Sequence, residues 1–258
     1  MISFRLSALL GLAVLVVSFT RGSAAVQPNI LVILADDMGV GDVSCLNPRS
    51  PWRTPAIDRL ASQGMVFSDA HSSSGVCTPT RYTLLTGRYS WRGRLKQGVL
   101  QGYGAALIEP GRLTMPGFLR QQGYATAMFG KWHLGLDWIR GPRPAGKDAV
   151  VKKQDKAKTK TTATEAEDDD GGWVDFKRPY GRGPLTLGFD EFFGFLVGGH
   201  NYALHPDADP EFGSGHSHNM IYRGDKLQKL DGFLTDIFTD EAIGFMDRNK
   251  QKPWMLYL

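Results

Sequence analysis

The stretch Cys77-Thr-Pro-Thr-Arg81 places a sulfur nucleophile four residues before a cation. Pro79 suits the first turn of a helix, residues 83–86 continue it and Gly87 can end it, so the pattern predicts a loop that enters a helix. Cys77 and Arg81 would then share one helical face, at a helix start whose free N–H groups favour an anion. On these two residues alone, a buried cysteine near an exposed arginine is the commoner arrangement.

A pair of carboxylates, Asp36-Asp37, directly follows the apolar run 29–34. Adjacent carboxylates repel each other, so they need a cation or burial as a neutral pair. Hard oxygen ligands favour calcium or magnesium. The alternative is a solvated turn, helped by Gly39 and Gly41.

Lys131 and His133 lie in the segment Gly130-Lys-Trp-His-Leu-Gly135. In an extended segment their side chains point to the same side. An ammonium group beside an imidazole can hold an anion and move a proton. The alternative is a surface lysine next to a hydrogen-bonded histidine.

Four further histidines fall in a stretch rich in glycine and proline, at positions 200, 205, 216 and 218. Their spacing matches no familiar metal-site pattern. His200, beside Gly198-Gly199, is the candidate for a contact with substrate.

The elements that must position these residues alternate between strand and helix. The apolar run 29–34 predicts a strand buried on both faces, because it has no polar alternation. Helices are expected at 54–64, 114–123 and from 235, and strands at 65–67, 124–129 and 254–258. Such alternation favours right-handed βαβ units, hence a parallel sheet with helices on both faces. The site residues would gather at the carboxyl ends of its strands.

Several of these stretches together resemble the type I sulfatase family. The match from Cys77 to Arg88 resembles the signature in which a cysteine followed by x-Pro-x-Arg is oxidised to formylglycine. The stretch 123–133 is similar to the second sulfatase signature, with Phe129 where a smaller residue is usual. The run Asp36–Asp42 resembles the calcium-binding segment, and 188–194 and 231–236 also resemble family segments that hold structure.

The resemblance implies an alkaline-phosphatase-like α/β fold, a doubly wound and mostly parallel sheet. It implies hydrolysis of aryl or carbohydrate sulfate esters: one hydroxyl of the hydrated aldehyde attacks sulfur, and the other is deprotonated later to expel sulfate. Asp36 and Asp37 would bind Ca²⁺, or Mg²⁺, with the formylglycine made from Cys77. Arg81 would stabilise the diol, Lys131 would hold a sulfate oxygen, and His133 would take the proton. The implied partners are a formylglycine-generating maturation enzyme and a sulfated small molecule or glycan.

The resemblance also implies a truncated chain. Two more metal ligands, a histidine and a lysine of the family have no matching position before Leu258, so the chain alone is expected to be inactive. Two other interpretations remain: a phosphodiester or phosphonate hydrolase of the same superfamily, and a non-catalytic fragment that binds sulfated glycans.

The 258 residues are 42% hydrophobic and 22% charged, which is ordinary globular composition. Residues 1–25 resemble a secretory signal peptide, which predicts a secreted or periplasmic protein with no stable membrane span after cleavage. A single membrane anchor is the alternative, but the apolar run is short for one. Residues 26–258 would form the catalytic portion.

An exported chain with two cysteines suggests a disulfide, but use of Cys77 as a nucleophile would leave Cys45 unpaired. Residues 147–170, lysine-rich and then acidic, have almost no large apolar side chains and are expected to form a disordered insertion. The net charge of +4 is modest, so nucleic acid is not expected as a partner.

Overall fold

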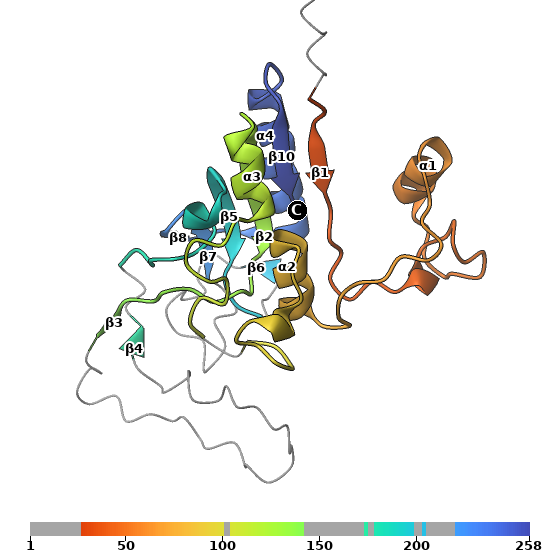
Figure 1. Ribbon diagram of the computed structural model, residues 1–258. Coiled ribbons are helices and arrows are strands. Elements are labelled where there is room, and N and C mark those ends of the chain that lie inside the picture. Colours follow the sequence, from red (N-terminus) through yellow and green to blue (C-terminus); the bar gives the residue numbers. More distant parts are fainter. Residues whose placement is uncertain (1–26, 101–103, 142–172, 175–177, 199–202, 205–219) are drawn as a thin grey trace, which may run out of the picture.

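A six-stranded sheet forms the centre of the molecule (Figure 1). The computed structural model describes residues 27–100, 104–141, 173–174, 178–198, 203–204 and 220–258. The expected signal peptide, the insertion 147–170 and His200 with the three histidines after it lie outside these residues. The strand order is β1-β10-β2-β5-β7-β8. The strands are β1 Ile30–Val32, β10 Trp254–Tyr257, β2 Ala125–Lys131, β5 Glu191–Phe195, β7 Ile221–Arg223 and β8 Lys226–Gln228.

The first four strands in this order run parallel, and β7 and β8 complete the sheet as antiparallel neighbours. Two short antiparallel pairs lie outside it: β3 Arg140–Gly141 with β4 Trp173–Val174, and β6 Ala203–Leu204 with β9 Gly232–Phe233. The mostly parallel sheet expected from the sequence is confirmed. Short 3₁₀ turns occur at η1 Val40–Asp42, η2 Ser90–Arg92 and η3 Leu185–Leu187.

Four helices accompany the sheet among the described residues: α1 Pro55–Gln63, α2 Cys77–Thr86, α3 Met115–Gln121 and α4 Leu234–Arg248. Their ends follow from the sequence. The Thr114 hydroxyl caps α3 by accepting a hydrogen bond from the Gly117 N–H at 3.1 Å. Gly87 ends α2 in the left-handed conformation, with φ at 65°, where its N–H donates to the Thr83 carbonyl.

Helices cover both faces of the sheet, as the alternation of elements predicted. On one face, Tyr82 and Leu85 of α2 pack with Met255 and Tyr257 of β10. On the other face, Trp254 and Leu256 of the same strand pack with α4, through residues such as Phe245. Phe129, the residue that departs from the family pattern, packs edge-on against Phe245 at 6.0 Å, so it lies on the α4 face rather than beneath α2.

β1 departs from the prediction of a strand buried on both faces. It pairs only with β10 and forms one edge of the described sheet. Leu31 is 44% exposed and Ile33 is 62% exposed. The prediction is wrong for this strand because an apolar run shows that a strand is suited to burial, whereas burial itself needs elements on both faces.

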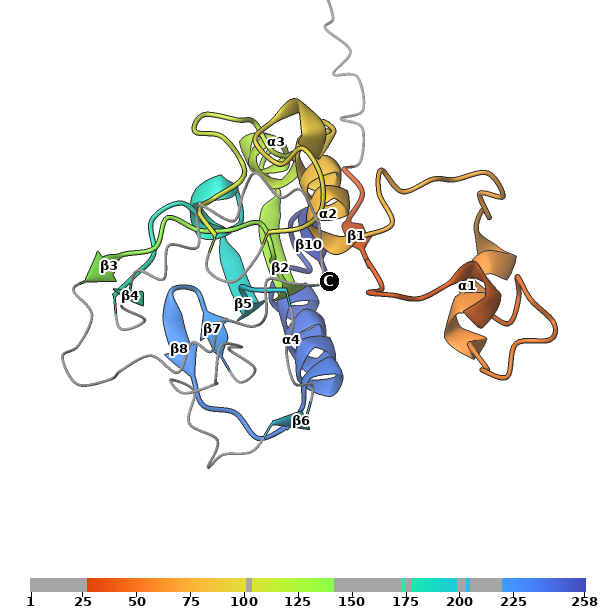
Figure 2. The same ribbon diagram turned by 90° about the horizontal axis from the view of Figure 1, so that it is seen from below.

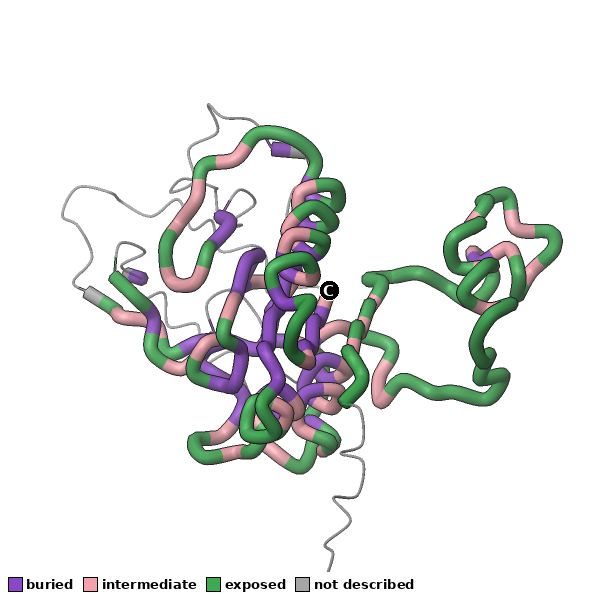
Figure 3. Tube along the Cα trace, turned by 90° about the horizontal axis from the view of Figure 1, so that it is seen from above, coloured by how far each residue is buried: buried purple, intermediate pink, exposed green. Residues whose placement is uncertain are grey.

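Residues 35–75 form an excursion that stands away from the sheet and carries α1 (Figures 1 and 2). The bounds of α1 match the prediction, but its apolar residues Ile57 and Leu60 are exposed, and Figure 3 shows this excursion as mostly exposed. The Thr54 hydroxyl bonds Ser44 and Asp58 instead of a helix N–H. Residues 65–67 form no strand, so that prediction is wrong: a strand needs a partner ladder, and this segment has none.

No helix within the described ranges combines the length and the apolar character that a membrane crossing requires.

Candidate active site

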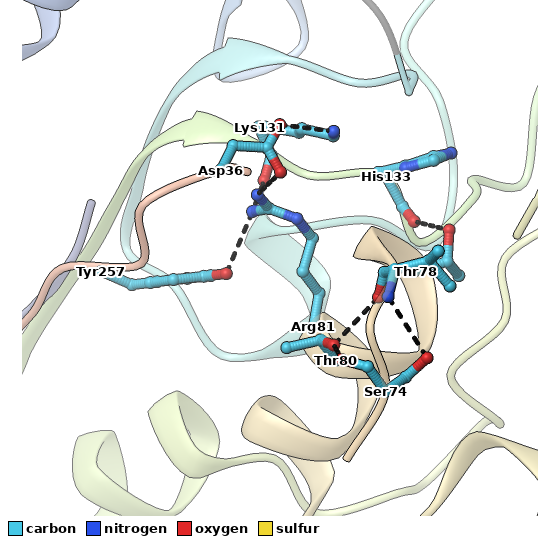
Figure 4. Close-up of polar contacts among 9 residues, drawn as sticks. Asp36, Ser74, Thr78, Thr80, Arg81, Lys131, His133 and Tyr257 are labelled. Atoms are coloured by element: carbon cyan, nitrogen blue, oxygen red, sulfur yellow. Dashed lines mark hydrogen bonds and ion pairs between the residues drawn. The ribbon is translucent and has the colours of Figure 1, made fainter. Parts of the chain in front are cut away.

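Four strand and helix ends converge on one region at the carboxyl edge of the parallel strands. Asp36 lies four residues beyond β1, Lys131 ends β2, Tyr257 ends β10 and Cys77 begins α2. Figure 4 shows the Asp36 carboxylate and the Tyr257 hydroxyl directed toward the guanidinium of Arg81, while the Lys131 ammonium is directed to Asp36. This edge is where parallel α/β sheets commonly bind ligands, because the strand ends and helix starts meet there.

Arg81 is the centre of this polar network. Its side chain is only 5% exposed. One terminal nitrogen donates to the Lys131 carbonyl at 2.6 Å and to the Tyr257 hydroxyl at 3.1 Å. The other lies 3.5 Å from the Asp36 carboxylate. A buried cation held by the ends of two strands and by the loop after β1 keeps a fixed position, which is what an anion-binding site requires.

Lys131 supplies the second cation, with its ammonium nitrogen 2.7 Å from the Asp36 carboxylate. Partial burial alone would raise the pKa of Asp36, but the hydrogen bond and charge of Lys131, with the charge of Arg81, lower it below its ordinary value. Asp36 is therefore an ionised carboxylate between two cations.

Cys77 is the first residue of α2, half-buried, and Val76 before it caps the helix with no side-chain hydrogen bond. The first-turn N–H groups and the positive end of the helix dipole therefore face the position of the nucleophile without a side-chain cap. Arg81 follows one turn later on the same helix. The predicted loop-to-helix arrangement of the Cys77–Arg81 stretch is confirmed.

His133 is fixed by a ring of contacts with Thr78 and Leu100. The Thr78 hydroxyl donates to the His133 carbonyl at 3.1 Å and accepts from the Leu100 N–H at 3.3 Å. The Leu100 carbonyl lies 2.9 Å from Nε2 of His133. Thr78 is fully buried, so this bridge joins the residue after Cys77 to the end of β2 inside the core.

The imidazole of His133 is buried and neutral at ordinary pH. Burial, assisted by the charges of Lys131 and Arg81, lowers its pKa to about 4, against the opposing effect of its hydrogen bond to the Leu100 carbonyl. Because a carbonyl can only accept, Nε2 carries the proton, and Nδ1 keeps its lone pair. Nδ1 is buried and has no hydrogen-bond partner among the described residues.

The backbone at His133 is not extended, contrary to the assumption that placed Lys131 and His133 on one side of a strand. Its φ is 52°, and Asp37 at 62° is the other non-glycine residue with positive φ in the described part of the chain. Such conformations are costly and persist where surrounding contacts hold them, often at functional sites. Both unusual residues belong to the candidate site.

Asp36 and Asp37 offer hard oxygen donors, which suit calcium. They supply only part of a coordination shell. Within the described ranges no three His, Cys, Asp or Glu side chains come together as a metal site, and the Asp36 carboxylate contacts Lys131 and Arg81. Cys45 and Cys77 are both free thiols, the first exposed and the second half-buried.

Sequence reasoning missed Tyr257 and Thr78. Tyr257 lies in the expected strand 254–258, near its carboxyl end. A hydroxyl at that edge of a parallel sheet is a signal that could have marked it as a site residue. Thr78 stood inside the Cys77–Arg81 stretch as an unassigned position. Its role depends on contacts 55 and 22 residues away in sequence, which no local pattern reveals.

Comparison with known proteins gives a consistent result. The family model described as Sulfatase matches residues 28–258. An N-acetylgalactosamine-6-O-sulfatase of Bacteroides thetaiotaomicron is 29% identical over 92% of this chain and 48% of its own length. A steryl-sulfatase of Mus musculus is 42% identical over 45% of this chain and 19% of its own.

Among solved structures, the crystal structure of "Ps i-CgsB" in complex with "k-i-k-neocarrahexaose" has a TM-score of 0.65 and 29% identity, covering 90% of this chain and 44% of the other. The N-acetylgalactosamine-6-O-sulfatase and this crystallised protein both match about nine-tenths of this chain. The chain therefore spans about half the length of each.

Proposed function

Because the chain belongs to the sulfatase family, we propose that its protein hydrolyses sulfate esters, with a formylglycine made from Cys77 as the nucleophile. The observation that supports this most directly is the network of Arg81, Lys131 and Asp36 beside the start of α2. Two fixed cations and a free helix N-terminus form a site for a tetrahedral anion, with the position of the nucleophile at its edge.

The chain's own residues can perform distinct parts of this reaction. Arg81, held on three sides, would keep its charge next to the nucleophile without reorganising. Lys131 would bind a sulfate oxygen with its ammonium group. His133 would accept a proton at Nδ1, the buried nitrogen that carries the lone pair.

Calcium and formylglycine are part of the proposal. Asp36 and Asp37, with the oxygen made at Cys77, would hold the ion, and residues beyond the described set would complete the shell. When bound, the ion would supply positive charge beside the sulfate oxygens, and the formylglycine would supply a hydrated aldehyde.

Sulfated carbohydrate is the substrate class that we favour. The relatives matched over about nine-tenths of this chain are an N-acetylgalactosamine-6-O-sulfatase and a protein crystallised with neocarrahexaose. The match to steryl-sulfatase covers under half of the chain. An aryl sulfate remains useful as a small test substrate.

The test is expression of the complete gene product with a formylglycine-generating enzyme. Mass spectrometry of the peptide containing Cys77 should show the aldehyde, and 4-nitrophenyl sulfate should be hydrolysed when calcium is present. Cys77→Ala should abolish turnover, whereas Cys45→Ala, which removes the exposed thiol, should leave it unchanged.

Two outcomes would overturn the proposal. An unmodified Cys77 thiol in protein that still hydrolyses the ester would exclude formylglycine. Faster hydrolysis of bis(4-nitrophenyl) phosphate than of the sulfate would favour a phosphodiesterase on the same site, and absence of both activities with formylglycine present would favour a binding protein.

A further inference from the structure

The turn that follows α2 carries an unusual concentration of cationic and aromatic side chains. Residues 88–96 contain no acidic residue. We call this segment the basic-aromatic turn. Its cations are Arg88, Arg92, Arg94 and Lys96, and its aromatic residues are Tyr89 and Trp91.

The two rings form an exposed platform. Tyr89 and Trp91 stack with their centroids 5.5 Å apart and their planes 17° from parallel. Tyr89 remains 48% exposed and Trp91 56% exposed. Stacked rings restrict each other's motion and still present apolar surface to solvent, which is the kind of surface on which the apolar face of a sugar ring packs.

Local contacts hold this platform in place. The Arg88 guanidinium donates to the Arg92 carbonyl at 2.9 Å, and the Lys96 ammonium donates to the Trp91 carbonyl at 3.1 Å. Gly93 lies so close to Glu109 that an added Cβ would sit 3.1 Å from its carboxylate oxygen. A turn fixed before binding loses little conformational entropy when a ligand arrives.

Arg92 leaves positive charge available on this platform. The nearby carboxylate, Glu109, is already shared by Arg88, Arg112 and the Tyr82 hydroxyl. The Arg92 side chain is exposed and has no partner among the described residues. A guanidinium matches the geometry of sulfate oxygens and can bind them through two parallel hydrogen bonds.

The basic-aromatic turn is linked to the candidate active site by the chain itself. Residues 96–100 lead from it to Leu100, whose backbone contacts both Thr78 and His133. The ten residues of α2 extend about 15 Å from Cys77 to the helix end that precedes the turn. A ligand that occupies both places must therefore contain several sugar units.

We propose that the basic-aromatic turn is a binding subsite for a sulfated polysaccharide chain, outside the centre that would cleave it. Trp91 and Tyr89 provide the surface for a sugar ring, and Arg92 pairs with a sulfate group. This inference rests on the proposed function for its substrate class, but the binding it describes can be measured without turnover.

The experiment compares two double variants of the complete protein. Trp91→Ala with Arg92→Ala removes the platform, and Trp52→Ala with Arg53→Ala removes the same dipeptide from another exposed position as the matched control. Affinity electrophoresis in ι-carrageenan should give a Kd at least tenfold weaker for the first variant and unchanged for the second. Agarose, an unsulfated galactan, should retain neither strongly.

Hydrolysis of 4-nitrophenyl sulfate should be unchanged in both variants, because neither dipeptide belongs to the candidate active site. Arg92→Glu, a single exposed change, repeats the test if the double variant is unstable. Undiminished carrageenan binding by the first variant, equal weakening in the control, or stronger binding to phosphatidylserine vesicles than to carrageenan would overturn the inference. Failure of the natural protein to hydrolyse the ester would contradict the proposed function and leave the binding result intact.

Discussion

At the scale of single residues, His133 carries the most constrained chemistry in the described chain. Its backbone has positive φ, its ring is buried, and its one described side-chain hydrogen bond goes to a main-chain carbonyl. Each of these features is costly in isolation. Together they hold a neutral imidazole with its free lone pair on Nδ1, an arrangement suited to accepting a proton.

The lowered pKa of His133 predicts that the free energy of unfolding decreases as the solution becomes acidic. The unfolded chain binds a proton at this residue below about pH 6.5, whereas the folded chain does so only near pH 4. The unfolded state therefore holds more protons between these values, and the free energy of unfolding falls as the pH drops from 6.5 toward 4, by up to about 3 kcal/mol.

Urea unfolding at a series of pH values measures this dependence. His133→Gln should flatten the slope between pH 6.5 and 4, because glutamine does not titrate. His71→Gln, at an exposed histidine, should leave the slope in place. An equal slope in the His133→Gln variant would mean that other groups cause the acid sensitivity.

Tyr257 acts on Arg81, so we predict that Tyr257→Phe lowers kcat with little change in KM. Loss of a hydrogen bond to a buried cation should also reduce the free energy of unfolding by about 1.5–3 kcal/mol. Tyr180→Phe is the control, since the Tyr180 hydroxyl donates to the Gly224 carbonyl, far from the candidate site. If both variants lose stability but neither loses kcat, Tyr257 is structural only.

Thr78 is a positioning residue, because it would act through His133 and Leu100. Thr78→Val keeps the shape and removes the hydroxyl, so it should lower kcat and cost about 1–3 kcal/mol of stability. Thr78→Ser should restore most of both. Formylglycine content must be measured in each variant, and unchanged kcat in fully converted Thr78→Val protein would contradict the assignment.

The sequence identified the residues with chemical character at this scale. Cys77, Arg81 and Asp36 became site candidates because their stretches resemble family signatures, whereas their residue types and spacing alone were also compatible with ordinary structural roles. The supporting side chains, Tyr257 and Thr78, could not be found in the same way, because their importance depends on distant partners. The hydrogen bond between Nε2 of His133 and the Leu100 carbonyl could not be predicted from the sequence either, because any residue at position 100 has the same backbone carbonyl.

At the scale of elements, β5 can approach β2 closely because Gly194 has no side chain. A Cβ at Gly194 would lie 1.8 Å from the Gly130 carbonyl oxygen, closer than any real contact. The two strands are in parallel register at this pair, one residue before Lys131. The position of the catalytic lysine proposed here therefore depends on glycine in the neighbouring strand.

Gly194→Ala should prevent folding or yield insoluble protein, because the clash involves backbone that cannot move aside. Gly75→Ala is the matched control, since nothing lies within 4 Å of its added Cβ. Soluble expression and far-UV circular dichroism distinguish the two. A soluble Gly194→Ala protein with native helix content would show that the strands can separate.

Helix bounds were predictable from local signals, whereas strand burial was not. Thr114, Gly87 and the apolar spacing of α4 gave helices close to those observed. The expected strand at 65–67 is absent because a strand forms only when a second segment hydrogen-bonds to it, and local sequence does not show whether such a partner exists. The partial exposure of β1 likewise depends on its neighbours.

At the scale of the whole molecule, apolar side chains are unevenly covered. Tyr82, Phe129 and Leu256 are fully enclosed between the sheet and its helices, while Leu60 and Phe67 on the excursion are largely exposed. Figure 3 shows the excursion as mostly exposed. An exposed apolar surface joined to a sheet edge favours association with other chains.

We therefore predict that residues 26–258, expressed alone, self-associate and bind the dye ANS. Leu31→Lys, which places a charge on the exposed edge strand, should reduce association measured by light scattering. Leu256→Lys, on a buried neighbouring strand, should instead prevent folding. A monodisperse monomer that binds no dye would contradict this expectation.

The carbonyl groups of Leu100 and Lys131, which hold His133 and Arg81, have a consequence for how the protein can vary. A main-chain acceptor is present whatever side chain occupies its position, so no point substitution deletes it directly. The site should accordingly tolerate apolar replacements of similar size at position 100, where Leu100 packs in the core, but be sensitive to insertion or deletion of a residue between the basic-aromatic turn and Leu100. The number of residues in this loop, rather than the side chain at position 100, sets where the Leu100 carbonyl holds the imidazole.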